Sequence, residues 1–253
     1  EELFAKGTGE STDIVQKEMY VFTDKGGERV TLRPEATPSM VRAFVEHGLE
    51  QALPFSKIYS LGPMFRYERP QRGRYRQFHQ LDVEVFGISD PAIDGEVIEM
   101  ATAFIDELGI QTAELVINSV GCTGCRPRFS QALLDALGKT VQDLCGDCQR
   151  RVKTNPLRIF DCKVQADQPI IEELPHSEDF LCDPCREHFA EVRRHLEAYG
   201  LQHRVSHRLV RGLDYYTRTV FEITPPVEGR TATIVGGGRY DGLIEQLGGN
   251  STP

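Results

Sequence analysis

The residues best suited to chemistry lie between positions 65 and 84, in the segment FRYERPQRGRYRQFHQLDVE. Its first part holds five arginines and one glutamate, a local net charge of about +4, whereas the whole chain carries −9. Arginine can bind phosphate oxygens through two parallel hydrogen bonds. The segment therefore predicts a polyanion site, with a solvated hairpin tip as the alternative from composition alone. The arginines are Arg66, Arg69, Arg72, Arg74 and Arg76.

A polar face follows directly after the arginines. Gln80, Asp82 and Glu84 alternate with apolar residues, so their side chains share one face of an extended strand. A carboxylate on such a face could bind a cationic ligand or one that carries N–H groups. The two features together predict an anion site beside a small polar ligand.

The elements that must position these residues follow from local patterns. Strand patterns at 57–67 and 75–87, joined through 70–73, predict an antiparallel hairpin with the arginines around its turn. Thr37 before Pro38, and Asp90 before Pro91, predict helix starts in which the first residue is the N-cap and the proline is the first helical residue. Further strands are predicted at 114–118, 204–210, 216–224 and 231–235. Strands joined by short turns, with helices outside the alternation, indicate an α+β fold with an antiparallel sheet.

Length and composition indicate one large domain with an insertion. The chain has 253 residues, 40% of them hydrophobic, which is enough for a sizeable core. Its composition changes at Gly121, so we expect a first part over 1–120, a helical insertion over 121–203 and a second part over 204–253. No apolar stretch approaches the roughly 20 residues of a membrane helix, and a cytoplasmic location without membrane contact is expected. The acidic balance argues against non-specific nucleic-acid binding but permits a local basic groove.

All seven cysteines lie in the expected insertion. Six of them form C-x-x-C pairs, a spacing that lets two thiolates bind one zinc ion, and two pairs complete a tetrahedral site. We expect zinc at Cys122, Cys125, Cys145 and Cys148, because these pairs flank one short helical stretch. A set of reduced thiols without metal is the alternative.

A glycine run, Gly236 to Gly238, lies between a strand pattern and a helix pattern. Its backbone N–H groups could bind an anion at a helix start. It is not a P-loop, because no Lys-Ser or Lys-Thr follows. Tight packing of a turn is the alternative.

Four segments give the chain a family resemblance: TLRPEATPSM at 31–40, FRYERPQRGRYRQFHQ at 65–80, LVRGLDYYTRTVFE at 209–222 and VGGGRYDGLIEQLGG at 235–249. With these segments the chain resembles the histidyl-tRNA synthetases, which are class II aminoacyl-tRNA synthetases. The resemblance implies an antiparallel sheet flanked by helices. It also implies activation of L-histidine by ATP with Mg, transfer of the histidyl group to tRNA(His), and a homodimer.

The same resemblance implies roles for individual residues. Arg66 would hold the α-phosphate and the substrate carboxylate, and Arg211 would stand where a metal ion could otherwise bridge them; both are expected to be catalytic. Glu84 and Tyr216 would bind the imidazole nitrogens. The histidine-binding residues implied are Glu35, Ala36, Thr37, Gln80, Glu84, Tyr215, Tyr216 and Gly237, and those for ATP are Arg66, Glu68, Arg74 and Phe78.

The resemblance has three further consequences. Asp167 stands where similar synthetases carry a cysteine, which suggests a second metal site at Cys162, Asp167, Cys182 and Cys185. Motif 1, motif 3 and the anticodon-binding domain are not found, so an internal fragment is expected, and its own activity is in question. Two other functions stay open: a regulatory paralogue that serves histidine biosynthesis, and a zinc-stabilised interaction fragment without catalysis.

Overall fold

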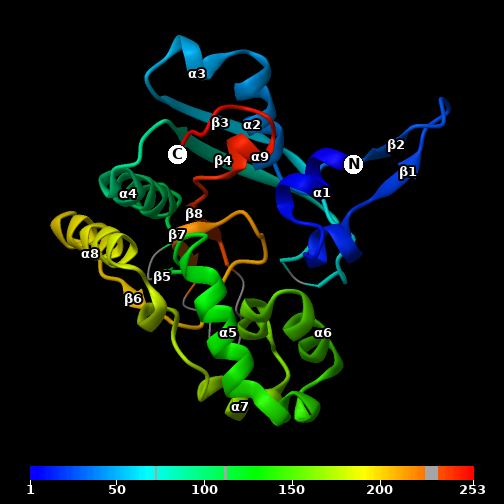
Figure 1. The fold of residues 1–253 in the computed structure, drawn as a ribbon. Coiled ribbons are helices and arrows are strands. Elements are labelled where there is room, and N and C mark those ends of the chain that lie inside the picture. Colours follow the sequence, from blue (N-terminus) through cyan, green and yellow to red (C-terminus); the bar gives the residue numbers. More distant parts are fainter. Residues whose placement is uncertain (72, 111–112, 226–232) are drawn as a thin grey trace. The chain divides into compact units, whose positions relative to one another are not determined.

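The computed structural model describes residues 1–71, 73–110, 113–225 and 233–253. The chain forms two compact units (Figure 1). Unit 1 consists of Glu1–Ser89, Gly212–Tyr215 and Tyr240–Pro253, and unit 2 consists of Asp90–Arg211 and Tyr216–Arg239. The domain boundaries expected at 120/121 and 203/204 stay a prediction.

Unit 1 is built on the predicted hairpin. Strands β3 (Ser56–Phe65) and β4 (Gln77–Phe86) pair antiparallel without interruption, from Ser56 opposite Phe86 to Phe65 opposite Gln77. Their connection carries the arginines as predicted, although Arg72 lies outside the described residues. Along β4, Phe78, Gln80, Asp82 and Glu84 are less exposed than His79 and Leu81, which lie on the other face, so the predicted polar face is confirmed.

Helix α2 (Thr37–Glu46) packs on this hairpin, with Met40 against Met64 and Phe78 (Figure 1). Thr37 is the first residue of the helix rather than its N-cap, which is Ala36. The expected capping role is wrong because the Thr37 hydroxyl donates a hydrogen bond to Glu84 instead. The other elements of unit 1 are α1 (Glu2–Thr8), a π-helical turn (Ile14–Glu18), β1 (Val21–Thr23), β2 (Arg29–Thr31), α3 (Leu49–Ala52) and α9 (Leu243–Gln246).

Unit 2 contains a four-stranded sheet in the order β6-β5-β7-β8. Its pairs are antiparallel except for β5 with the short β6, which is parallel. Of the strand predicted at 204–210, only Arg204–Val205 forms a strand. The strand predicted at 231–235 begins only at Val235, and residues 231–232 lie outside the described residues. The strands are β5 (Glu114–Ser119), β6 (Arg204–Val205), β7 (Thr217–Thr224) and β8 (Val235–Arg239).

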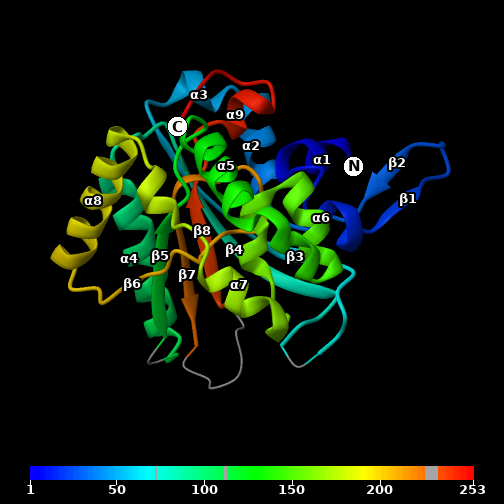
Figure 2. The same ribbon diagram turned by 60° about the horizontal axis from the view of Figure 1, so that its bottom comes forward.

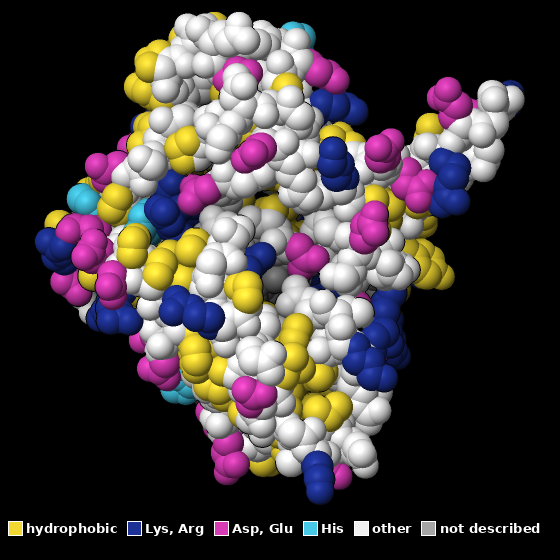
Figure 3. Space-filling view, viewed as in Figure 1, with side chains coloured by type: hydrophobic (Ala, Val, Ile, Leu, Met, Phe, Trp, Pro, Cys, Tyr) yellow, Lys and Arg dark blue, Asp and Glu magenta, His cyan; other side chains and the backbone are white. Residues whose placement is uncertain are grey.

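Helices α4 (Pro91–Glu107) and α8 (Asp183–Ala198) lie side by side and pack on this sheet (Figure 2). Asp90 caps α4 as predicted, accepting the Ala92 N–H at 2.8 Å. The apolar residues of α8 bury against the sheet, while its outward face carries interspersed acidic and basic side chains, visible at the left of Figure 3. The core here consists of Ile98, Ala101, Leu115, Ile117, Phe189, Val192, Leu196, Phe221 and Ile223.

The segment between β5 and α8 is helical, as predicted. It folds around a hydrophobic cluster of its own, which includes Phe129, Leu133, Ile159 and Ile171. Its elements are α5 (Cys125–Leu137), α6 (Gly146–Thr154), α7 (Gln168–Glu172) and 3-10 turns at Gly138–Asp143, Pro156–Asp161, Gln165–Asp167 and Ser177–Phe180. Among the described residues, no helix is long and apolar enough to cross a membrane.

A buried ion network joins α4, α8 and β8 in unit 2. The Asp94 carboxylate accepts a hydrogen bond from the Arg239 guanidinium at 2.7 Å and lies 2.8 Å from His188 Nε2. Burial acts to raise the pKa of Asp94, but these partners outweigh it and lower the pKa below its ordinary value. The network fixes the end of β8, and removing the Asp94 carboxylate would take a buried counter-charge away from Arg239.

We expect Asp94→Asn to destabilise the protein by about 3 to 5 kcal/mol, because Arg239 and His188 would lose the buried carboxylate that they share. Urea denaturation measures the free energy of unfolding. Asp106→Asn, the same change at an exposed position of α4, is the control and should change it little. Equal losses in the two variants would show that the network contributes no specific stability.

Candidate active site

Two buried carboxylates lie at the centre of unit 1. Glu35 accepts hydrogen bonds from the hydroxyls of Thr8 and Tyr215, the latter at 2.9 Å. Glu84 accepts from Thr37 at 2.7 Å and from Tyr240. Each carboxylate thus has one hydroxyl donor on each oxygen.

Two further acceptors share the strand face with Glu84. Gln80 Oε1 and Asp82 Oδ2 are buried and have no hydrogen-bond partner among the described residues. Across the hairpin, Gln80 is paired with Gly62, where a Cβ atom would lie 2.5 Å from the Arg33 guanidinium. This face therefore offers two buried acceptor atoms that lack a hydrogen-bond donor among the described residues, and a ligand with N–H groups would satisfy them.

The two strand carboxyls are hard to ionise. Burial raises the pKa of Glu84 to about 7, although the donors Tyr240 and Thr37 act to lower it. Burial also raises the pKa of Asp82 to about 6, together with the nearby charge of Glu35 and against that of Arg66. A ligand cation would favour the ionised form of both carboxyls.

The arginine-rich connection places its side chains differently from one another. The Arg66 guanidinium donates to the Pro34 carbonyl at 2.8 Å and lies over the Phe78 ring, 5.3 Å from its centre. Arg74 forms an ion pair with Glu68 at 3.0 Å. The structure thus brings Arg66 to Phe78 and Arg74 to Glu68, as two pairs among the residues that the resemblance implies for ATP.

In unit 2, Arg211 lies against strands β7 and β8. Its guanidinium pairs with the Glu222 carboxylate and lies 6.0 Å from the centre of the Tyr216 ring. Glu222 is opposite Gly236 in the sheet, and a Cβ atom on Gly236 would lie only 2.5 Å from the guanidinium. The guanidinium occupies the space that this missing side chain leaves.

The glycine run is part of strand β8, so the expectation that it is a turn or a helix start is wrong. Its glycines permit close approach from both faces of the strand. A Cβ on Gly238 would lie 2.9 Å from the Tyr216 ring, and one on Gly237 would lie 2.8 Å from Phe221. Gly237 therefore faces the hydrophobic core of the sheet, whereas Gly236 and Gly238 face Arg211 and Tyr216.

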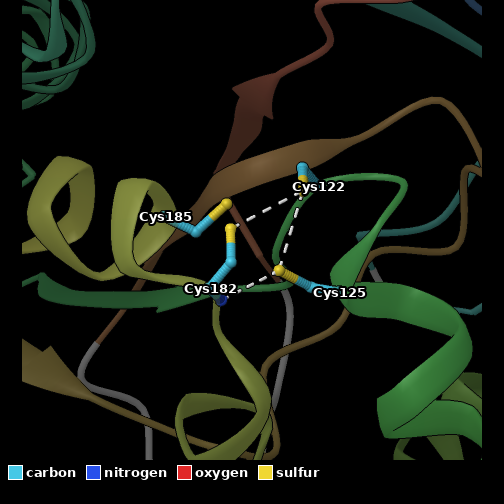
Figure 4. A group of neighbouring side chains, drawn as sticks. All are labelled: Cys122, Cys125, Cys182 and Cys185. Carbon is cyan, nitrogen blue, oxygen red and sulfur yellow. Dashed lines mark hydrogen bonds between the residues drawn. The ribbon is translucent and has the colours of Figure 1, made fainter.

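The cysteines gather in two sets that differ from the expected grouping. Cys122 and Cys125 lie with Cys182 and Cys185, and the four sulfurs point toward one another (Figure 4). The second set joins Cys145 and Cys148 with Cys162 and Asp167. In each set the possible ligand atoms all lie within 4.8 Å of one another. Within the part of the chain that the structure describes, neither expected set is brought together: Cys122 and Cys125 lie apart from Cys145 and Cys148, and Cys162 and Asp167 lie apart from Cys182 and Cys185.

Several residues of the site were missed by the sequence analysis. Tyr240 donates to Glu84 within unit 1, and Thr8 donates to Glu35. Tyr240 directly follows the glycine run and Arg239, so its place in GGGRYDGL was the available signal. Nothing in the local pattern around Thr8 indicates its role.

Comparison with known proteins places this geometry in a family. The family model for histidyl-tRNA synthetase matches residues 1–253. The chain belongs to the histidyl-tRNA synthetase family. It is 50% identical to a histidine-tRNA ligase of Syntrophotalea carbinolica and 54% identical to one of Desulforamulus reducens, each over 252 residues, which are 100% of this chain and 60% of the relative.

A solved structure agrees with this assignment. The crystal structure of apo S. aureus histidyl-tRNA synthetase matches with a TM-score of 0.74 and 37% identity, over 99% of this chain and 58% of that one. The α+β class expected from the sequence is confirmed. The chain spans about 60% of the length of the curated relatives that it matches.

The buried carboxyl of Glu84 predicts a pH dependence of stability. Its pKa is raised in the folded state, so between about pH 4.5 and 7 the unfolded chain has lost a proton that the folded protein keeps. The contribution of Glu84 to the free energy of unfolding therefore falls as pH rises through this window. Glu84→Gln should remove this component, on the order of 3 kcal/mol, and its stability relative to the parent should improve as pH rises from 4 to 8.

Chemical denaturation at several pH values measures this difference. Glu28→Gln, at an exposed position of unit 1, is the control and should leave the pH profile unchanged. A constant difference between Glu84→Gln and the parent from pH 4 to 8 would contradict the raised pKa.

Proposed function

We propose that this chain is the catalytic part of an enzyme that activates L-histidine with ATP and transfers the histidyl group to tRNA(His). The products of the first step would be histidyl-adenylate and pyrophosphate. We further propose that the whole enzyme acts in the cytoplasm. Membership of the family supports the reaction class.

The observation that carries the choice of amino acid is the acceptor-rich face of unit 1. Histidine has an α-ammonium group and an imidazole ring, so it offers N–H donors at both ends. Glu35, Thr37 and Gln80 would accept from the ammonium group, and Glu84 would accept from the ring. An amino acid without a second donor would leave buried acceptors unpaired, which can lower its reaction by about 10⁴-fold or more.

Asp82 is an addition to this set. Its buried carboxyl oxygen lacks a partner among the described residues, and it lies on the strand face between Gln80 and Glu84. Together with Glu35 it would help to make the pocket negative. A cationic amino acid relieves the mutual repulsion of these groups, and this favours its binding.

The first step brings two anions together, the histidine carboxylate and the α-phosphate of ATP. Arg66 would hold both, and its contact with Pro34 and Phe78 fixes the guanidinium before the ligands bind. Phe78 would stack on the adenine from the same segment, with Glu68 and Arg74 near the base and the phosphates. Bound Mg would neutralise further phosphate charge.

Arg211 would act on the α-phosphate from unit 2. Its ion pair with Glu222 and the gap at Gly236 hold the guanidinium in one place, so little reorganisation is needed when charge develops. Tyr216 lies near Arg211 and would contact the imidazole, and Ala36 and Tyr215 would line the amino-acid site. Gly237 would take part only through its backbone, because a side chain there would face Phe221 in the core of the sheet.

A homodimer is part of the proposal for the whole enzyme. Leu61 and Leu81 face each other across the hairpin and are 70% and 44% exposed. An exposed apolar pair of this kind on a strand surface suits contact with a second copy.

The test is pyrophosphate exchange by the full-length enzyme with each of the twenty amino acids. Histidine alone should support exchange, and Glu84→Gln should raise the KM for histidine by roughly 10- to 100-fold, the effect of one charged hydrogen bond. The KM for ATP should stay within a few-fold of the parent value, as should both constants in Glu28→Gln. No exchange with any amino acid would favour the regulatory paralogue or the interaction fragment, and equal losses for both substrates would assign Glu84 a role in folding.

A second prediction concerns Arg211. Arg211→Ala should lower kcat for adenylate formation by about 100-fold with little change in histidine affinity, because its interaction strengthens as charge develops at the α-phosphate. Gly236→Ala should have an effect in the same direction, since the new methyl group displaces the guanidinium.

Two matched variants control for general damage. Arg204 forms an exposed pair with Glu114, and a Cβ on Gly146 would meet no atom within 4 Å. Arg204→Ala and Gly146→Ala should therefore keep the parent kcat in single-turnover measurements. An unchanged kcat in Arg211→Ala would refute the proposed role.

A further inference from the structure

The four sulfurs of Cys122, Cys125, Cys182 and Cys185 have the spacing of a metal site. Cys122 Sγ lies 3.7 Å from Cys125 Sγ and 3.9 Å from Cys182 Sγ. A zinc ion bound to four thiolates at about 2.3 Å places its sulfurs about 3.8 Å apart at the corners of a tetrahedron. Disulfide sulfurs would lie about 2.05 Å apart, and all seven cysteines are free thiols here.

The surrounding backbone is shaped for this cluster. The Cys182 N–H donates to Cys125 Sγ at 3.2 Å, which is the kind of second interaction that orients a metal ligand. Gly121 has a φ of +71°, and a Cβ atom there would lie 2.5 Å from Cys125 Cβ. Only glycine fits this tight turn, which directs the first cysteine pair toward the second.

Four thiols converging on one point would be poor packing without an ion. Two of them, Cys125 and Cys185, are buried beside Leu181, and a thiol is only a weak donor and acceptor. An apolar cluster would be filled better by carbon side chains of similar size. We propose that Cys122, Cys125, Cys182 and Cys185 bind a structural zinc ion.

The zinc ion would join the two ends of the helical segment between β5 and α8. Cys122 and Cys182 are 60 positions apart along the chain; Cys122 lies three residues before the first residue of α5, and Cys182 is the N-cap of α8. A closed tetrahedral site with four protein ligands leaves no position for a substrate, so its role is structural. It would hold α5 against α8, while the hydrophobic cluster of the segment stabilises the rest.

The site also touches strand β7 close to Tyr216. The Gly121 carbonyl accepts the Arg218 N–H at 2.8 Å, and the Arg218 carbonyl accepts the Val120 N–H at 2.8 Å. Arg218 has a φ of 52°, an uncommon conformation for a residue other than glycine, which its neighbours must maintain. Arg126, which follows Cys125, donates to the Tyr216 carbonyl. The zinc site therefore positions the backbone on both sides of Thr217.

The second set carries an independent proposal of the same kind. Cys145 Sγ lies 3.9 Å from Cys162 Sγ, and Cys162 Sγ lies 3.2 Å from the buried Asp167 carboxylate. Three thiolates and one carboxylate oxygen are a suitable ligand set for zinc. We infer that Cys145, Cys148, Cys162 and Asp167 bind a second zinc ion, within the hydrophobic cluster of the helical segment.

Metal analysis of the full-length enzyme, purified without chelators, tests both sites. Cys182→Ser should lose one equivalent of zinc relative to the parent, Asp167→Ala should lose one other, and the double variant should lose two. Thr123→Ala and Lys163→Ala change exposed residues beside the ligands and should lose none. Unchanged zinc in a ligand variant would overturn the corresponding site.

Two measurements keep the proposals testable if the ligand variants do not fold. Cobalt exchanged into the parent enzyme should give the thiolate charge-transfer and visible bands of tetrahedral Co²⁺. Thiol titration should find the seven cysteines of this chain protected until a chelator is added. Absent cobalt bands, together with freely titratable thiols before chelation, would show that both sets are only reduced cysteines.

The link to Tyr216 has its own readout in amide hydrogen exchange. Zinc removal should speed exchange at the Val120 and Arg218 N–H groups by on the order of ten-fold, while the β5–β7 pairs away from the turn stay protected. Unchanged exchange at both amides after zinc loss would overturn the positioning role. This test does not involve catalysis, so its result is independent of the proposed function.

Discussion

The burial of two carboxylates, Glu35 and Glu84, is the constraint on which unit 1 depends. A buried carboxylate needs donors, and here each one receives two hydroxyl groups. The donors Thr8, Thr37 and Tyr215 come from α1, α2 and the short segment at 212–215, and Tyr240 opens the last segment of the chain. Satisfying the two acids therefore joins parts of unit 1 that are far apart in the sequence.

Unit 2 solves a related problem with missing side chains. The Arg211 guanidinium lies close against strand β8. Glu222 provides its counter-charge, and the missing side chain of Gly236 provides the space. Gly237 leaves space for the Phe221 ring on one face of the strand, and Gly238 leaves space for the Tyr216 ring on the other. A strand without side chains is weak in itself. The Asp94 contact to Arg239 at its end compensates by fixing that end to α4.

Local periodicity predicted the elements whose residues interact with near neighbours. The alternation along 80–84 predicted the polar face of β4, and Asp90 with Pro91 predicted the start of α4, because both signals act within a few residues. The partners of the cysteine pairs could not be predicted in this way. Every C-x-x-C pair has the same spacing in the sequence, and the path of the chain through α5 to α8 decides which pairs meet.

Long-range contacts also account for two other expectations that were wrong. Glycines in a run usually indicate a turn, but β8 needs them because Arg211, Phe221 and Tyr216 approach it from elsewhere in the chain. Thr37 before Pro38 has the pattern of an N-cap, yet its hydroxyl is required by Glu84, 47 positions away. In both places a contact at long range outweighs the local preference, and both lie in segments that carry the family resemblance.

The acidic face of β4 links stability to ligand binding. Without a ligand, Glu84 and Asp82 hold protons more tightly than ordinary carboxyls, because burial and mutual repulsion both disfavour the charged forms. A bound cation lowers the pKa of both carboxyls again. In the proposed function, the binding of histidine is therefore accompanied by the release of protons from Glu84 and Asp82. Burying these carboxyls costs free energy of desolvation. A ligand with donors at both ends offsets that cost when it binds, whereas a ligand without them does not, and this difference makes the pocket selective.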